Sequence, residues 1–189
     1  MKVILVAIMM VILSGCATQA PDVALSKKQY SIDVGKVSVS NLSVPNERNE
    51  GGAWTSGLIK LADSNTNPTF SKYVFESLNQ NLTPSSPSGN GVLEVMLLRA
   101  DLLMEVRVAD SIAFVAFASV LSERDYVCSV EANFKYGVTN ERKKFESKKV
   151  FNRGWSDIDT AAKKEIIESC VESIVQDSAS FANSFVKKK

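Results

Sequence analysis

The stretch from residue 123 to residue 138 alternates between apolar and polar side chains more regularly than any other part of this chain. A period of two residues is that of a strand with one face buried and the other in water. The apolar set is Tyr126, Cys128, Val130, Ala132, Phe134 and Tyr136, and the polar set is Asp125, Ser129, Glu131, Asn133 and Lys135. Another layer of the fold must therefore cover the apolar face.

Three other stretches have the composition of strands. Residues 32–39 change parity at Gly35, which predicts a short first strand with a bulge. A long stretch from Val92 is apolar on both parities at its start and charged on one parity from Arg99 onward. We expect this strand to be covered on both faces at its start and wet on one side at its end. After a turn near residues 139–140, a Lys-rich stretch predicts an edge strand.

Two stretches have the period of helices that bury one side. The first is predicted to begin at Pro68 with Asn67 as its cap, and to end before Pro84. The second is predicted to begin after Ser156, which forms a capping box with Asp159, and to run to about Phe185. The buried stripes are Phe70, Val74, Leu78 and Leu82 in the first, and Ile158, Ala162, Ile166, Cys170, Ile174, Ser178 and Ala182 in the second.

The order of these elements predicts an α+β fold. It reads strand, helix, three mostly antiparallel strands, helix, which gives an antiparallel or mixed sheet of about four strands with two helices packed on one face. The polar residues 46–67, with a small apolar island, are predicted to form a mobile excursion between the first strand and the first helix.

The N-terminus has the pattern of an export signal. Lys2 is followed by an apolar run over residues 3–13, which is the length of a signal-peptide core and too short for a membrane span. The next residues, Leu13, Ser14, Gly15 and Cys16, resemble the lipobox of bacterial lipoproteins. An ordinary secretory signal peptide with a chance cysteine is the alternative.

The lipobox resemblance implies cleavage after Gly15 and acylation of Cys16. Several acyl chains on one residue hold a protein at a bilayer without a transmembrane helix. Ala17 in place of Asp implies passage to the periplasmic face of the outer membrane. The chain then divides into a signal peptide (1–15), a lipidated tether (16–29) and a single periplasmic domain (30–189). As a free chain, residues 17–29 could span up to about 45 Å.

Cys128 and Cys170 remain as an even pair in an oxidising compartment, which predicts a disulfide between them. Each lies on the predicted buried face of its element, so the bond would fasten the C-terminal helix to the sheet. Chain entropy gives a stabilisation of roughly 4 kcal/mol for a closed loop of this size. Two free buried thiols are the alternative.

The whole layout resembles the small periplasmic α/β lipoproteins of the outer membrane. These include the lipopolysaccharide-assembly lipoprotein that sits inside its β-barrel partner, the auxiliary lipoproteins of lipid-transport systems, and the YajG-like lipoproteins. The lipobox is the residue-level motif of this resemblance, so no binding residue carries over from it.

Composition excludes several classes of function. The chain has 22 Lys and Arg against 21 Asp and Glu, and the loss of Lys2 would leave it neutral, which argues against nucleic acid as a partner. It has no His, which removes the usual general base and the commonest metal ligand. We expect a protein that is not an enzyme, with no metal and no cofactor beyond the lipid on Cys16.

An apolar run over residues 112–121 stands where a short polar turn would be expected. It either completes the core or forms a contact surface for a partner or for lipid, through Ile112, Phe114, Val115 and Phe117. The expected function is a membrane-anchored accessory lipoprotein of the outer membrane that docks on another envelope component. The alternative is a periplasmic carrier of lipid or another small apolar ligand, in a cavity between helices and sheet.

Overall fold

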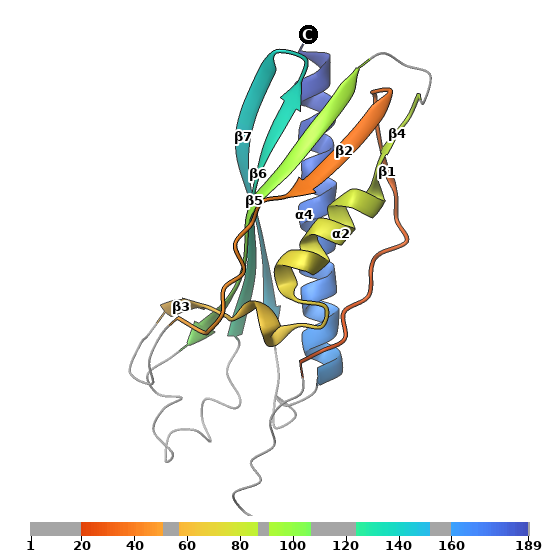
Figure 1. The fold of residues 1–189 in the computed structure, drawn as a ribbon. Helices are drawn as coiled ribbons and strands as arrows, with labels where there is room; N and C mark the ends of the chain where they lie inside the picture. Colours follow the sequence, from red (N-terminus) through yellow and green to blue (C-terminus); the bar gives the residue numbers. More distant parts are fainter. Residues whose placement is uncertain (1–19, 51–56, 87–90, 107–123, 152–159, 189) are drawn as a thin grey trace, which may run out of the picture.

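The computed structural model describes residues 20–50, 57–86, 91–106, 124–151 and 160–188, and these form a layer of helices on a twisted sheet (Figure 1). The five-stranded sheet has the order β2-β5-β6-β7, and β3 also pairs with β5. Its strands are β2 (Lys36–Asn41), β3 (Gly57–Lys60), β5 (Val92–Val106), β6 (Arg124–Tyr136) and β7 (Thr139–Phe151). A separate parallel pair consists of β1 (Tyr30–Ile32) and β4 (Leu82–Pro84). The helices are α2 (Phe70–Asn81), α4 (Thr160–Lys187) and the short 3-10 turn η1 (Asp63–Asn65).

The predicted α+β class is confirmed, but the sheet is larger and more mixed than predicted. β5, β6 and β7 are antiparallel, as predicted, whereas β2 runs parallel to β5. The predicted first strand is in fact two strands, because β1 pairs with β4 and β2 pairs with β5. The predicted excursion contains β3 and η1, and the Asn46 side chain donates a hydrogen bond to Leu61 O at 3.1 Å that ties its two arms together.

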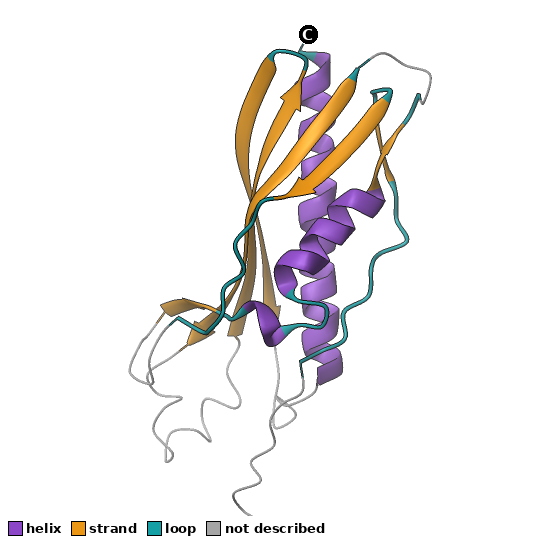
Figure 2. Cartoon of the chain, viewed as in Figure 1, coloured by secondary structure: helices purple, strands orange, loops and turns teal. Residues whose placement is uncertain are grey.

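Both helices and one face of the sheet enclose a single core (Figure 2). Cys128, Val130 and Phe134 of β6 are buried, as the alternation predicts, and Phe134 meets Phe181 of α4 edge-on at 4.9 Å. The α4 stripe is buried at Ala162, Cys170, Ile174, Ser178 and Ala182 and half-buried at Ile166. The predicted cap at Ser156 lies outside the described residues.

The long strand β5 changes faces partway along. Register with β6 slips between Leu97 and Arg99, so Leu98 is an extra residue. Leu93, Val95 and Leu97 therefore share the covered face with Ala100 and Leu102. The prediction that the start of this strand is covered on both faces is wrong, because Val92, on the other face, is exposed and Met96 and Leu98 are only half-buried. The extra residue makes the odd-numbered residues before it and the even-numbered residues after it face the core.

Residues 20–29 are packed on the domain, although they were predicted to form part of a free tether. Pro21 and Val23 are buried, and Asn67 exchanges backbone hydrogen bonds with both residues. The helix α2 begins at Phe70 with Thr69 at its N-cap position, and not at Pro68 with Asn67 as the predicted cap. The backbone of Asn67 is instead bonded to the N-terminal segment. We call residues 20–29 the strap.

Candidate functional site: the open face of the sheet

The candidate site lies on the sheet face opposite the helices. The register places three rows of side chains across β5, β6 and β7 on this face. The rows are Arg99–Glu131–Lys144, Asp101–Ser129–Glu146 and Leu103–Val127–Lys148. Lys60 of β3 is opposite Leu103 and extends the third row, and Leu58, opposite Glu105, lies on the same face. The residues of the three rows and Leu58 line a hollow of about 570 Å³, and we call this surface the open face.

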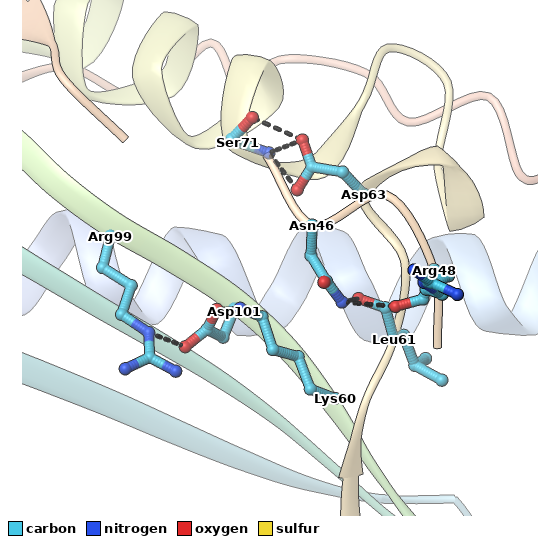
Figure 3. Close-up of polar contacts among 8 residues, drawn as sticks. All are labelled: Asn46, Arg48, Lys60, Leu61, Asp63, Ser71, Arg99 and Asp101. Atoms are coloured by element: carbon cyan, nitrogen blue, oxygen red, sulfur yellow. Dashed lines mark hydrogen bonds and ion pairs between the residues drawn. The ribbon is translucent and has the colours of Figure 1, made fainter. Parts of the chain in front are cut away.

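Asp101 lies at the centre of the open face and is 5% exposed. Its Oδ1 atom is 2.9 Å from Lys60 Nζ, and its Oδ2 atom forms an ion pair with Arg99 Nε (Figure 3). The Lys60 side chain is also mostly buried, whereas that of Arg99 is mostly exposed. A carboxylate removed from water needs such partners, so Asp101 holds two cations on the surface in fixed positions.

Other charges on the open face are paired along and across the strands. Arg142 Nε lies 2.5 Å from Glu131 Oε1, and this hydrogen bond holds the pKa of Glu131 below its usual value. Lys144 Nζ lies 2.6 Å from Glu146 Oε1 and likewise lowers the pKa of Glu146. Both carboxylates are therefore ionised at neutral pH, and the face presents a fixed pattern of alternating charge.

Hydrogen bonds in the segments that flank β3 hold the β3 side of the open face in place (Figure 3). Asp63 of η1 is buried and accepts hydrogen bonds from the backbone N–H of Ser71, at 3.3 Å, and from its hydroxyl. The carboxylate therefore caps the first turn of α2, where the helix dipole favours a negative charge. The Asn46 amide donates to Arg48 O at 2.7 Å and to Leu61 O. This framework positions Leu58 and Lys60 at the edge of the hollow.

The predicted site residues fall into two groups. Cys16 and the predicted contact residues Ile112, Phe114, Val115 and Phe117 lie outside the described residues. Cys128 and Cys170 are brought together as a disulfide with Cα atoms 6.1 Å apart, fully buried between β6 and α4. The open face was not predicted as a site. The sequence features that mark it are the polar residues at alternate positions from 125 to 135 and the charged residues of the long strand from Arg99 onward.

A second, smaller cavity of about 340 Å³ lies on the helix side, near the start of the strap. Ala20 and Pro21 line it together with Leu102, Tyr126 and Lys163. Within the ranges that the structure describes, no three His, Cys, Asp or Glu side chains converge as metal ligands would. Nor does any helix in those ranges have the length and apolar character needed to cross a membrane.

No family model and no curated protein matches this chain. Among solved structures, one that matches is a Xanthomonas campestris protein of the family DUF330, with 11% sequence identity. The match covers 89% of this chain and 96% of that chain, with a TM-score of 0.41. This likeness is too distant to carry a fold or a function over to this chain.

Proposed function

We propose that this chain is a lipid-anchored accessory protein on the periplasmic face of the bacterial outer membrane, and that it docks on another envelope protein through the open face. The anchor rests on the resemblance of Leu13–Ser14–Gly15–Cys16 to a lipobox. The docking role rests on one observation, which is a hollowed sheet face with paired charges and no covering layer in the described part of the chain.

The composition of the open face is that of a docking surface. Leu58 is 55% exposed and Val150 is 50% exposed, and both belong to strands of this sheet. Leu103 and Val127 line the hollow between charged neighbours. Protein interfaces combine an apolar centre with a polar rim, and charges fixed before binding select the partner and steer its approach.

The interior supports docking over the alternative of a lipid carrier. A carrier of this size needs a large apolar void between helices and sheet. In the described part of the chain, large side chains fill this space: Phe70, Tyr73, Leu78 and Phe134 are at most 1% exposed. The cavity near Ala20 and Lys163 is lined in part by polar side chains and is smaller than the hollow on the open face.

The proposed role is not enzymatic. The chain has no His, and the acidic and basic groups on the open face are engaged with one another in ion pairs. The hydroxyl of Ser129 lies 3.4 Å from Glu146, which is itself paired with Lys144. These groups offer charge and hydrogen bonds to a partner. The proposal includes no metal, no nucleic acid and no cofactor beyond the lipid on Cys16.

A site-specific crosslinking experiment tests the docking face. A photo-reactive amino acid is placed at Leu58 or Lys144 on the open face, or at Lys72 on α2 as the matched control, since Lys144 and Lys72 are 61% and 62% exposed. We expect one envelope protein to be crosslinked in intact cells from positions 58 and 144 but not from position 72. Equal crosslinking from all three positions would contradict the proposed face.

The same surface is then tested by substitution. Leu58→Asp places a charge at an exposed position, so we expect the melting temperature to change little while co-purification of the crosslinked protein falls about tenfold, the effect of losing one apolar anchor. Lys72→Asp is the control and should leave co-purification unchanged.

A further inference from the structure

The strap fixes where the chain enters the domain. Asn67 N–H donates to Pro21 O at 3.0 Å, and Val23 N–H donates to Asn67 O at 2.9 Å. The side chain of Tyr73 is buried, and its hydroxyl donates to Ala24 O at 3.1 Å. Backbone bonds and buried side chains therefore hold the chain from Pro21 onward.

The strap then runs along α4 in the same direction as the helix. Ala24 N–H donates to Glu168 at 2.6 Å, and Lys28 Nζ lies 3.4 Å from Glu172. The chain keeps this direction into β1, where Asn183 donates to Ser31 O at 3.0 Å. Asn81 of α2 secures the other side by donating to Ser26 O and Lys28 O at 3.1 and 2.6 Å. The strap therefore begins at one end of the domain and cannot leave the surface without breaking these contacts.

The held strap shortens the tether to the lipid. From Cys16 to Ala20 there are four peptide units, which reach at most about 14 Å when fully extended. A tether free up to residue 29 would reach about 45 Å. The anchored end of the domain is therefore confined to a thin layer above the bilayer.

The length of the domain along α4 determines how far its opposite end can lie from the bilayer. Ala20 and Pro21 line the same cavity as Lys163 and Ile167 in the first turns of α4. α4 has 28 residues, which correspond to about 42 Å at 1.5 Å per residue. The C-terminus and the β6–β7 turn lie at the opposite end (Figure 1).

We infer that the end of the domain formed by Ala20, η1 and the first turns of α4 is the surface that meets the lipid bilayer, and that α4 leads away from it. This inference rests on the proposed lipid on Cys16. The large apolar side chains exposed on the described surface are Leu42, Val44, Leu58, Val92, Val138 and Val150, which come from both ends of the sheet and its edges. They give no broad apolar side on which the domain would lie flat. The open face is then roughly perpendicular to the membrane surface, so a protein that binds it must lie at the same membrane.

Energy transfer from labelled protein to labelled vesicles tests this orientation. The chain from Cys16 to Lys189 keeps every contact described above, and its Cys16 thiol is coupled to a maleimide-bearing lipid. Cys128 and Cys170 do not compete for the maleimide because they form a buried disulfide. A donor dye is attached through an azide-bearing residue at Ser64 in η1 or at Val138 in the β6–β7 turn, both of which are exposed. The acceptor dye is on the lipid headgroups.

We expect several-fold stronger transfer from position 64 than from position 138. A long flexible Gly/Ser insertion after Ala17 is the control, and it should weaken the transfer from position 64 and shrink the difference. Equal transfer from the two positions in the unextended chain, or stronger transfer from position 138, would overturn the inference.

Because the maleimide-bearing lipid anchors Cys16 without acylation in cells, this test is independent of the test of the proposed function. If Cys16 carries no acyl chain in cells, or if no protein binds the open face, the proposed function fails while the transfer gradient persists. If the gradient is absent, the orientation fails although lipidation and docking can both hold.

Discussion

Asp101 is the residue on the open face whose charge is most removed from water. The Asp101→Ala substitution would leave Lys60, whose side chain is 17% exposed, without its carboxylate. Loss of one partner of a buried ion pair destabilises a protein by about 3–5 kcal/mol. Because Lys60 keeps some contact with water, we expect the free energy of unfolding to fall by the lower end of that range, about 3 kcal/mol, in urea denaturation.

Two further variants give this prediction its controls. Glu94 and Lys135 form an ion pair on the same sheet with both side chains more than 40% exposed, so Glu94→Ala should cost less than about 1 kcal/mol. Replacing both buried partners, with Lys60→Met and Asp101→Leu together, should recover most of the loss. Similar losses from Asp101→Ala and Glu94→Ala would show that burial of Asp101 does not govern its contribution.

Glu131 gives a titration test of the charge pattern. Arg142 lowers the pKa of Glu131, so its carboxylate should titrate below the ordinary value of 4.5 in the folded chain. Because the folded pKa is depressed, the ion pair stabilises the fold above the unfolded pKa, and this contribution is lost as the pH falls through the folded pKa. Carbon-13 NMR of the carboxyl group should show the low midpoint, which Arg142→Gln should raise and Lys72→Gln should not. An unchanged midpoint in Arg142→Gln would remove Arg142 as the cause.

At the scale of elements, the disulfide joins β6 to α4 across the core. Cys128 and Cys170 are separated by 42 residues, and closing a loop of this length stabilises the fold by roughly 4 kcal/mol through the entropy of the unfolded chain. We expect Cys128→Ala and Cys170→Ala each to lower the free energy of unfolding by a few kcal/mol, up to that value. Urea denaturation of both variants measures the loss. The oxidised wild type should also migrate faster than either variant in non-reducing electrophoresis, and two titratable thiols per folded wild-type chain would rule the bond out.

The elements that the sequence predicts well are those with one long uninterrupted period. The alternation from Tyr126 to Tyr136 and the stripe through Cys170 and Ile174 identify by periodicity alone the side of each element that faces the core. The alternation does not predict that Val127 and Ser129, on the other face of β6, are also buried, at 8% and 7% exposed. In β5 the same method fails, because one inserted residue at Leu98 exchanges the two faces without a glycine or proline to mark it.

Short elements were missed for a different reason. β1 and β4 have three residues each, and β3 has four, so none contains enough repeats to show a period. Their pairing depends on partners far along the chain, such as Tyr30 with Leu82 and Leu58 with Glu105. The open face shares this dependence: the charges after Arg99 predict a wet surface, but the hollow exists only through the register of β3, β5, β6 and β7.

At the scale of the whole molecule, the strap changes the relation between domain and anchor. Its sequence is polar and has no period, which is typical of a tether, and its contacts come from Asn67, Asn81 and Glu168, all distant in sequence. A segment fixed by a few hydrogen bonds to remote residues and by two buried side chains, Pro21 and Val23, leaves no periodic pattern in its own sequence. The strap consequently belongs to the packed domain, although its composition assigns it to the tether.

The anchor itself is open to a direct test. If residues 13–16 function as a lipobox, Cys16→Ser should leave the precursor uncleaved, because serine cannot supply the thioether that carries the diacylglycerol. Each buried methylene of the acyl chains contributes about 0.8 kcal/mol, so a multiply acylated Cys16 should hold the wild-type protein in the outer-membrane fraction. Metabolic labelling with a fatty-acid analogue should mark the wild type and the Cys128→Ala control but not Cys16→Ser. An ordinary secretory signal peptide would instead give a cleaved, unlabelled protein in the soluble periplasmic fraction for both Cys16→Ser and the wild type.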